Sequence, residues 1–379
     1  MKLNEKIYNC ILCAVIGDII GFGNGEIEFN NNIDLSIKGD KDLERLSGIS
    51  PYHVSNFISN GGMTNYDMKN KNASDDTILL LATFDAMIST FNLDDDKILN
   101  KVEELLLKYY NNDKKKEKRG YGNRTIMSLK RLNDGKDWRK WGFAEKAGGS
   151  GASMRSMGIG LIYNGKKNRN KLIKLSILSS VITHNNPLGY LGGLASALFT
   201  AYAFEGVSPD LWPFELLKIL KSKELDVVID DIVKHYPETK NKHLEYIKQK
   251  FQRRWENYIE FRFNDGKFIE LEYLPDWKIF DLRSIQYYKY FGSDGYFNPG
   301  SNGCDSVIIA YDCFRDSKTF ESLIYYAMLH VGDSDTTGCI AGAFHGAYYG
   351  NKVKLVDNLK DVEFANEIKK LCEKATKLL

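Results

Sequence analysis

Two short segments of this sequence place paired carboxylates directly before a helix-forming run. Ser74 to Thr77 (SDDT) precedes an apolar stretch, and Gly332 to Thr337 (GDSDTT) precedes a stretch rich in glycine and alanine. One side chain is enough to cap a helix, because Ser, Thr and Asp accept the free N–H groups at its start. Capping alone is the simplest interpretation of either segment, but four carboxylates and several hydroxyls provide more oxygen than two caps need.

Oxygen-rich segments of this kind are typical of a cation site. Crowded carboxylates repel one another unless a cation or a proton lies between them. Oxygen ligands without His or Cys partners suit Mg²⁺, Mn²⁺ or Ca²⁺ rather than zinc. The sequence therefore predicts a metal site built from both segments.

Residues 17–29 (GDIIGFGNGEIEF) form a glycine-rich segment near the N-terminus. It is not a dinucleotide fingerprint, since G-x-G-x-G is one residue short of G-x-G-x-x-G and no βαβ unit follows. We expect a loop that carries Glu26 and Glu28. A carboxylate on such a loop can act as a general base or a lid, although a solvated loop glutamate is the commoner case.

Three further segments have the composition of ligand-binding turns. In residues 147–155 (AGGSGASMR), exposed backbone N–H groups can hold phosphate oxygens, although most glycine turns are only turns. Residues 292–305 (GSDGYFNPGSNGCD) suit a loop that stacks on a planar ring through Tyr296 and Phe297, unless these rings belong to the core. His184 lies in the helix-breaking turn THNNP, where it can reach a ligand or serve a structural role.

The elements that must position these residues are helical. Apolar residues predict buried helices over 77–90, 172–181, 189–204 and 320–329, and small residues over 338–350 allow close backbone contact. The best strand candidate is 268–274 (FIELEYL). No repeat and no Gly/Ser/Pro-rich linker divides the chain, so residues 1–379 are predicted to form one all-α domain.

Composition narrows the partners and the compartment. With 52 Lys and Arg against 50 Asp and Glu, the net charge of +2 favours neither nucleic acid nor an acidic membrane as partner. The apolar run 11–20 is too short to span a bilayer, and no signal-peptide cleavage site follows it. Six cysteines in 379 residues indicate a reducing compartment, by default the cytoplasm. Cys10 and Cys13 are interpreted as core thiols, and the charge run 113–119 as a solvated loop.

Seven segments in order resemble one known family. They are GDIIGFGNGEIEF, SDDT, GGSGASMRSMGIGL, THNNPLGYLGGLASALFTAYA, RRWENYIEFR, DSVIIAYD and HVGDSDTTGCIAG. Together they resemble the ADP-ribosylglycohydrolases, and among these the ADP-ribosylarginine hydrolases most closely. The resemblance runs from about residue 5 to the C-terminus and implies a compact, orthogonal all-α domain with two Mg²⁺ ions, or Mn²⁺ as a substitute, in a central cleft.

The resemblance also implies a site, residue by residue. The metal ligands would be Ser74, Asp75, Asp76, Asp333, Asp335 and Thr336. Glu28 corresponds to an acidic loop residue over the cleft. ADP-ribose would be held by Thr125, Gly148, Gly149, Ser150, Gly151, Ser153, Thr183, His184, Tyr296, Phe297, Asn298, Ser301, Asn302, Gly303 and Asp305. This chain departs from its relatives at Ala147, where an acidic residue is frequent, and at Asn298-Pro299, which replaces an aromatic residue and a glycine.

The implied reaction is hydrolysis of the N-glycosidic bond between ribose C1″ and a protein arginine, with ADP-ribosylated proteins as partners of a monomeric enzyme. Asp75, Asp76 or Glu28 would be the acid/base, and the sequence does not rank them. The alternatives are release of ADP-ribose from serine, from O-acetyl-ADP-ribose or from a polymer, and a non-catalytic ADP-ribose-binding paralogue. A metal phosphoesterase is disfavoured, because such sites usually recruit His.

Overall fold

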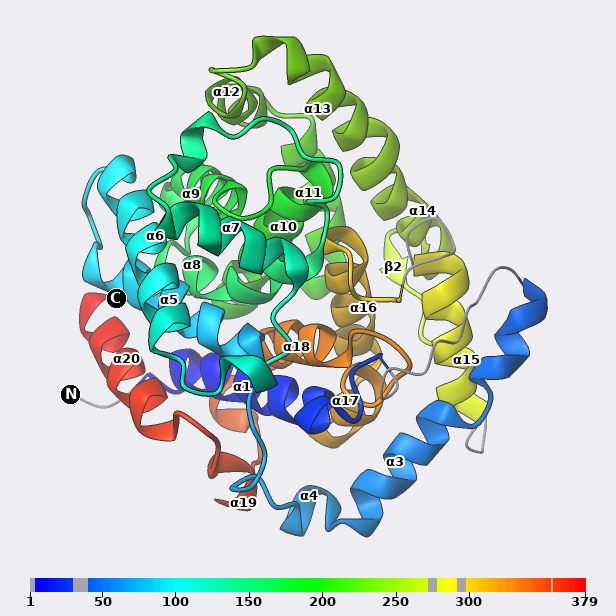
Figure 1. Cartoon of the computed structure of the whole chain (residues 1–379). Helices are drawn as coiled ribbons and strands as arrows, with labels where there is room; N and C mark the ends of the chain where they lie inside the picture. The colour runs from blue at the N-terminus through cyan, green and yellow to red at the C-terminus, as the bar shows by residue number, and fades with distance from the viewer. Residues whose placement is uncertain (1–3, 30–39, 272–277, 292–297, 356) are drawn as a thin grey trace.

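Helices build most of the computed structural model, which describes residues 4–29, 40–271, 278–291, 298–355 and 357–379 (Figure 1). The described α-helices are α1 (Glu5–Phe22), α3 (Ile49–Ser59), α4 (Gly62–Asn65), α5 (Asp75–Ser89), α6 (Asp95–Asn112), α7 (Asn123–Asn133), α8 (Met157–Ile162), α9 (Arg169–Val181), α10 (Pro187–Glu205), α11 (Trp212–Leu220), α12 (Lys223–Ile232), α13 (Lys240–Tyr246), α14 (Arg253–Arg262), α15 (Lys278–Gln286), α16 (Gly303–Asp316), α17 (Phe320–Ala327), α18 (Ser334–Tyr349), α19 (Asp357–Lys360) and α20 (Ala365–Leu378). The prediction of an all-α fold is confirmed.

Helices α1 and α18 lie side by side in the middle of the molecule, with α5, α10, α16, α17 and α20 around them (Figure 1). Glycines of α18 remove the side chains that would keep the two backbones apart. A Cβ atom on Gly342 would lie 2.2 Å from the carbonyl oxygen of Cys13, and one on Gly346 would lie 2.0 Å from that of Asn9. The close approach that the small residues of 338–350 predict is confirmed.

The four predicted buried helices are confirmed as α5, α9, α10 and α17, each within three residues of its predicted ends. Their apolar residues join one hydrophobic cluster that extends from Ile7 to Ala375. Helix α1 belongs to the same cluster. It is long and apolar enough to cross a membrane, but 83% of that window is buried inside the fold. Cys10 and Cys13 are buried free thiols within it, as predicted.

The predicted strand over 268–274 is wrong for most of its described part. Strand β2 consists of Lys267–Phe268 and pairs only with β1 (Phe263–Asn264), while Ile269 to Leu271 have no regular structure. Residues 272–274 lie outside the described part of the chain. Helix α14 ends at Arg262, one residue before β1, so the partner strand is too short to support a longer ladder.

Candidate metal centre and neighbouring ligand site

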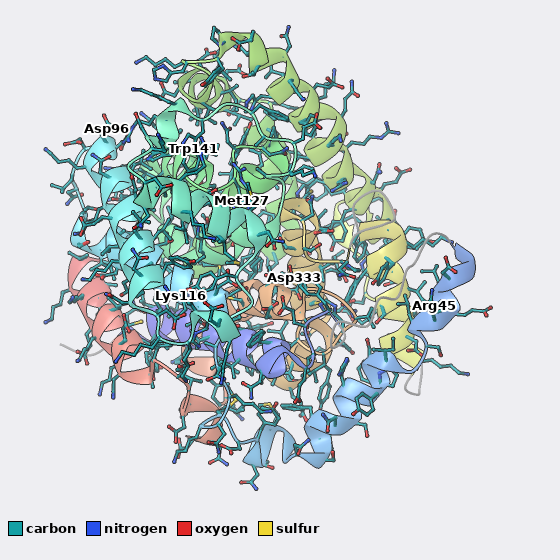
Figure 2. The ribbon with its side chains drawn as sticks, in the orientation of Figure 1. Arg45, Asp96, Lys116, Met127, Trp141 and Asp333 are labelled. Carbon is teal, nitrogen blue, oxygen red and sulfur yellow. The ribbon has the colours of Figure 1, made fainter. Side chains whose placement is uncertain are left out.

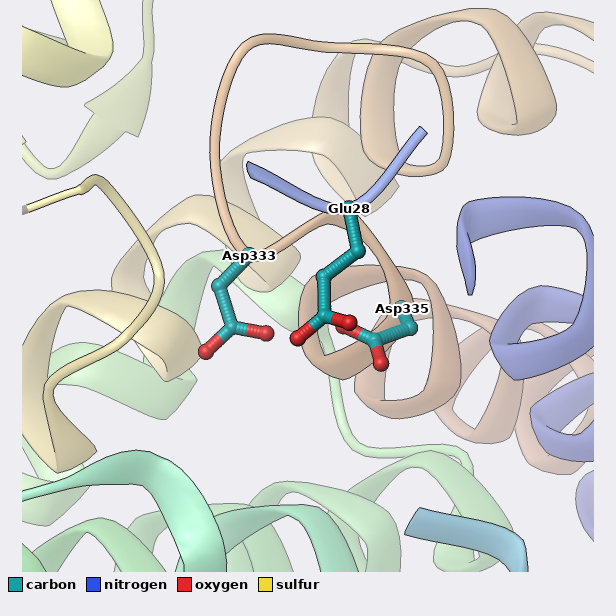
Figure 3. A group of neighbouring side chains, drawn as sticks. All are labelled: Glu28, Asp333 and Asp335. Atoms are coloured by element: carbon teal, nitrogen blue, oxygen red, sulfur yellow. The ribbon is translucent and has the colours of Figure 1, made fainter. Parts of the chain in front are cut away.

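The acidic centre forms where the loop after α1 meets the N-terminus of α18. Carboxylate oxygens of Glu28, Asp333 and Asp335 lie within 4.8 Å of one another, an arrangement that could hold a metal ion. Figure 3 shows the three side chains pointing toward one another, Glu28 from the N-terminal loop and the two aspartates from the start of α18. In Figure 2, Asp333 is surrounded by helices, whereas Arg45 and Asp96 lie toward the edge. Asp333 and Asp335 are only 4% and 2% exposed.

The SDDT segment converges on the same centre from α5. Ser74 is the N-cap, and its hydroxyl accepts the backbone N–H of Asp76 at 3.1 Å. Asp75 and Asp76 stand in the first helical turn, where the helix dipole favours negative charge. Burial, followed by the charges of Asp335 and Asp18, raises the pKa of both carboxyls well above the ordinary value. The SDDT and GDSDTT segments therefore lie close enough for their carboxyl groups to interact electrostatically.

Asp18 is a central residue that the sequence reasoning missed. It is fully buried on α1, and its carboxylate accepts the N–H of Ser74 at 3.1 Å, the N–H of Thr77 at 3.1 Å and the Thr77 hydroxyl. Burial and the nearby charge of Asp335 raise its pKa to about 7. An aspartate inside an otherwise apolar helix was the available signal, because a buried carboxylate needs partners.

The start of α18 is held by the two predicted ligand loops. The Ser150 hydroxyl donates to Oδ2 of Asp333 at 3.1 Å, and the backbone N–H of Asp333 donates to the carbonyl of Pro299 at 2.8 Å. The carboxylate of Asp335 accepts the N–H of Thr336 at 2.8 Å, and Thr336 is 2% exposed. Burial raises the pKa of Asp333 to about 6 despite these hydrogen bonds.

Carboxyl groups accumulate in this centre without a basic partner in the described part of the chain. Among the described residues, no salt bridge reaches Asp18, Glu28, Asp75, Asp76, Asp333 or Asp335. Burial, and after it Asp335, Asp333, Asp75 and Asp18, raises the pKa of Glu28 to about 11. Oδ2 of Asp76 is buried and has no hydrogen-bond partner in the described structure. Hard oxygen donors, excess negative charge and an unsatisfied carboxylate oxygen fit Mg²⁺ or Mn²⁺.

Arg119 stabilises the SDDT segment through hydrogen bonds to its backbone and to the residue before it. Its guanidinium donates to the carbonyl of Ala73 at 2.6 Å and to the carboxylate of Glu363 at 2.7 Å, while its own carbonyl accepts the N–H of Asp75 at 2.9 Å. It also pairs with Asp113 at 3.2 Å. The interpretation of 113–119 as a solvated loop is therefore wrong for Arg119, which is 2% exposed. Composition could not show that Arg119 folds inward to meet Glu363.

The two predicted ligand turns pair with each other beside the acidic centre. Gly149 and Asn302 form an antiparallel bridge, flanked by the bonds from Ser150 N to Ser301 O at 3.0 Å and from Gly303 N to Gly148 O at 2.9 Å. This pairing places the glycine turn next to the start of α16. This pairing could not be predicted from local sequence, because it joins residues about 150 positions apart.

Thr125, Gly151 and His184 meet on the other side of the glycine turn. A Cβ atom on Gly151 would lie 2.8 Å from both the Thr125 hydroxyl oxygen and Cε1 of His184, so these residues are in direct contact. Nδ1 of His184 lies 2.8 Å from the Thr183 hydroxyl. Burial lowers the pKa of His184 to about 3, so its imidazole is neutral at pH 7.

Several predicted ligand residues hold the chain together in this structure. The Ser153 hydroxyl donates to Ser150 O at 2.7 Å, and the Ser301 hydroxyl donates to Asn298 O at 2.7 Å. Asn302 and Asp305 form the capping box of α16. Tyr296 and Phe297 lie outside the described residues.

Comparison with known proteins decides the family. A family model described as ADP-ribosylglycohydrolase matches residues 1–379. The chain belongs to the ADP-ribosylglycohydrolase family. The resemblance found in its motifs is thereby confirmed, and with it the assignment to hydrolases of ADP-ribose linkages.

Individual ADP-ribosylglycohydrolases match over most of the chain. ADP-ribosylhydrolase ARH1 of Dictyostelium discoideum is 31% identical over 97% of this chain and 93% of its own length. A protein of Acanthamoeba polyphaga mimivirus, named as an ADP-ribosyl glycohydrolase, is 34% identical over 94% of this chain, which spans 66% of that relative. ADP-ribosylhydrolase ARH3 of Danio rerio is 23% identical over 91% of this chain. A solved structure titled ADP-ribosylglycohydrolase-related protein complex has the same fold, with a TM-score of 0.55 at 15% identity over 99% of this chain and 98% of its own.

Proposed function

We propose that this family member hydrolyses the N-glycosidic bond between ADP-ribose and an arginine side chain of a modified protein, and that the reaction depends on Mg²⁺. The observation that carries the proposal is the convergence of six buried or half-buried carboxylates, without a basic partner among the described residues, beside the turn formed by Gly148 to Ser153. The arginine linkage rests on the motif resemblance. The similarity to ARH1 over nearly the whole of both chains supports a hydrolase.

Ser74, Asp75, Asp76, Asp333, Asp335 and Thr336 would hold two Mg²⁺ ions, with Asp18 fixing Ser74 and Thr77 behind them. When bound, the ions supply Lewis acidity that activates water and orients ribose hydroxyls. Their fit rests on the oxygen donor set and on the unpartnered Oδ2 of Asp76.

We assign the proton transfer to Glu28. It is half-buried on a loop, whereas Asp75 and Asp76 are 5% and 2% exposed and are better placed to hold cations. Ionised Glu28, which a cation bound beside it would favour over the protonated form, accepts a proton from a water molecule as the water oxygen bonds to C1″. The bond from C1″ to the guanidine nitrogen breaks, and that nitrogen takes the proton from Glu28 as arginine leaves, which returns Glu28 to its ionised form. Neutral His184 and Thr125 would position the ADP-ribose by hydrogen bonds.

Replacing Asp75 and Asp76 together with Asn tests the proposed metal site. The double variant should lose release of ADP-ribose from modified arginine while circular dichroism shows an unchanged helical content. Wild-type release should stop in EDTA and return with Mg²⁺. Full activity of the double variant, or activity undiminished by chelator, would reject the proposed site.

A second candidate is removal of ADP-ribose from serine, from O-acetyl-ADP-ribose or from a polymer. The similarity to ARH3 and the departures at Ala147 and Asn298-Pro299 favour testing it. Side-by-side turnover of arginine-linked and serine-linked peptides decides between the linkages. Calorimetric binding of ADP-ribose with no turnover of any linkage in Mg²⁺ would indicate a non-catalytic binding protein instead.

We further propose a monomeric, single-domain protein of the cytoplasm. The continuous hydrophobic cluster supports one domain, and six free buried cysteines suit a reducing compartment. Analytical ultracentrifugation and a single cooperative unfolding transition would check the first two statements, and localisation of a tagged chain would check the third.

A further inference from the structure

A pocket of about 1070 Å³ lies between helix α3 and the loop that leads to Glu28. Gly23, Glu26 and Ile27 of that loop form one wall. Tyr52, His53 and Asn56 of α3 form another, and Tyr66, Asp67, Asn70 and Lys71 form a third. The pocket is separate from the glycine turn that contacts His184, because none of its lining residues belongs to that turn.

Two walls of this pocket continue directly into the acidic centre. Glu26 is two residues before Glu28, and Asn70 is four residues before Ser74. The Asn24 side chain ties these walls together, accepting the N–H of Asn72 at 2.8 Å. Two residues of chain span at most roughly 7 Å. The backbone of Glu26 in the pocket wall therefore lies within roughly 7 Å of the backbone of Glu28, a span comparable to an extended arginine side chain.

The lining offers polar contacts that a peptide can use. Tyr52 is 65% exposed, and Asn56, Asn60 and Asn70 provide amide donors and acceptors. His53 is 7% exposed, and its Nε2 has no hydrogen-bond partner in the described part of the chain. A buried polar atom without a partner costs free energy that a ligand can restore.

The charged residues of the pocket also favour a peptide as its ligand. Burial, together with the nearby carboxylates of Glu26 and Asp67, raises the pKa of Tyr66 to about 12. Two carboxylates, Glu26 and Asp67, against the single ammonium of Lys71 leave the lining acidic, which disfavours the pyrophosphate of ADP-ribose and favours a basic side chain. Lys71 lies over the Tyr66 ring, 5.7 Å from its centre.

We propose that this pocket binds the polypeptide of the ADP-ribosylated target next to its modified residue, with preference for a basic side chain nearby. The inference rests on the proposed function, because it assumes that the acidic centre acts on modified proteins. The pocket then determines which proteins are substrates, while the acidic centre determines the bond that is cleaved.

The test compares a protein substrate with a small one. Asn56→Trp fills the pocket from an exposed position on α3, and Ser55→Trp is the matched control, exposed on the same helix but outside the lining. For Asn56→Trp, kcat/KM on arginine-modified protein should fall at least tenfold through KM, while kcat/KM on free ADP-ribosyl-arginine changes less than twofold. Ser55→Trp should leave both values unchanged. Equal losses on both substrates, or no loss on either, would overturn the proposal.

A binding measurement separates this inference from the proposed function. Fluorescence anisotropy with the Asp76→Asn protein uses basic peptides modified on arginine or on serine, and ADP-ribose alone. A modified peptide should bind at least tenfold tighter than ADP-ribose, and Asn56→Trp should remove that difference without changing ADP-ribose binding. Peptides that bind no tighter than ADP-ribose would refute the pocket's role. Peptide-dependent binding without any hydrolysis by the wild-type protein would refute the proposed function alone.

Discussion

The carboxylate of Glu363 accepts the backbone N–H of Ala73 at 3.0 Å, although 290 positions separate the two residues. The same carboxylate pairs with Arg119, which donates to the carbonyl of Ala73. Both polar groups of the Ala73 backbone are thus held by one ion pair, immediately before the first predicted metal ligand. The C-terminal segment therefore positions the start of α5.

Glu363→Gln should weaken this positioning. Burial alone would raise the pKa of Glu363, but hydrogen bonds from Arg119 and Lys115 lower it to about 2. A lowered carboxylate pKa gives stability that is present above the unfolded pKa near 4.5 and lost as the pH falls toward 2. At pH 7 the free energy of unfolding of the variant should be lower by about 1–3 kcal/mol. Calorimetry should show weaker Mg²⁺ binding. In acid, the stabilities of the variant and the wild type should converge.

Asp361→Asn is the control for this change. Asp361 lies two residues away and pairs with Lys69 at 3.0 Å, but both side chains are more than half exposed. Its loss should alter stability by less than about 0.5 kcal/mol. Equal effects of the two variants on Mg²⁺ affinity would contradict the bracing role of Glu363.

Binding of Mg²⁺ should weaken as the pH falls from 8 to 5.5. Burial raises the pKa of Asp333 to about 6 and that of Asp18 to about 7, so protons compete with the cation in this range. The raised pKa values of Asp333 and Asp18 also affect the stability of the metal-free fold. Their protonated forms contribute stability that is fully present below the unfolded pKa. This stability is lost as the pH rises through the folded pKa values of about 6 and 7. Isothermal titration at the two pH values, in buffers of different ionisation enthalpy, measures both affinity and proton release. An affinity independent of pH would be incompatible with ligands from this cluster.

Gly151→Ala should disturb the ligand site much more than Gly149→Ala. The new Cβ at position 151 would press on His184 and Thr125 at 2.8 Å, whereas at position 149 the nearest atom lies 3.6 Å away. We expect at least a tenfold loss of kcat/KM for the first variant and less than a twofold change for the second. Similar kinetics for the two variants would show that the contact between Gly151, Thr125 and His184 does not matter for turnover.

Gly346→Ala should destabilise the fold, although alanine is the better helix former by about 1 kcal/mol. Its Cβ would lie 2.0 Å from the carbonyl of Asn9, and overpacking of this kind costs roughly 1–3 kcal/mol. Gly122→Ala is a matched control, because its Cβ would meet nothing within 4 Å. Thermal unfolding should separate the two variants by several degrees, and an unchanged midpoint for Gly346→Ala would argue against the close helix contact.

The sequence predicted those features whose signal is local. Paired carboxylates before α5 and α18, the apolar helices and the small residues of α18 are all visible within a few residues. Asp18 was missed, because its partners Ser74 and Thr77 lie more than 50 positions away. Arg119 was interpreted by the composition of its neighbours, whereas its partner Glu363 comes from the far end of the chain. The strand prediction rested on the residue types of 268–274. These do not show that α14 extends to Arg262, which leaves a partner strand, β1, of only two residues.

The contact between α1 and α18 also limits how this chain can vary in length. Inserting one residue into either helix would rotate everything beyond it by about 100° and turn Asp18 or the glycines of α18 away from their partners. Tolerated insertions should therefore fall in exposed turns such as residues 134–136, whereas random insertion libraries should recover almost no functional clones within α1 or α18.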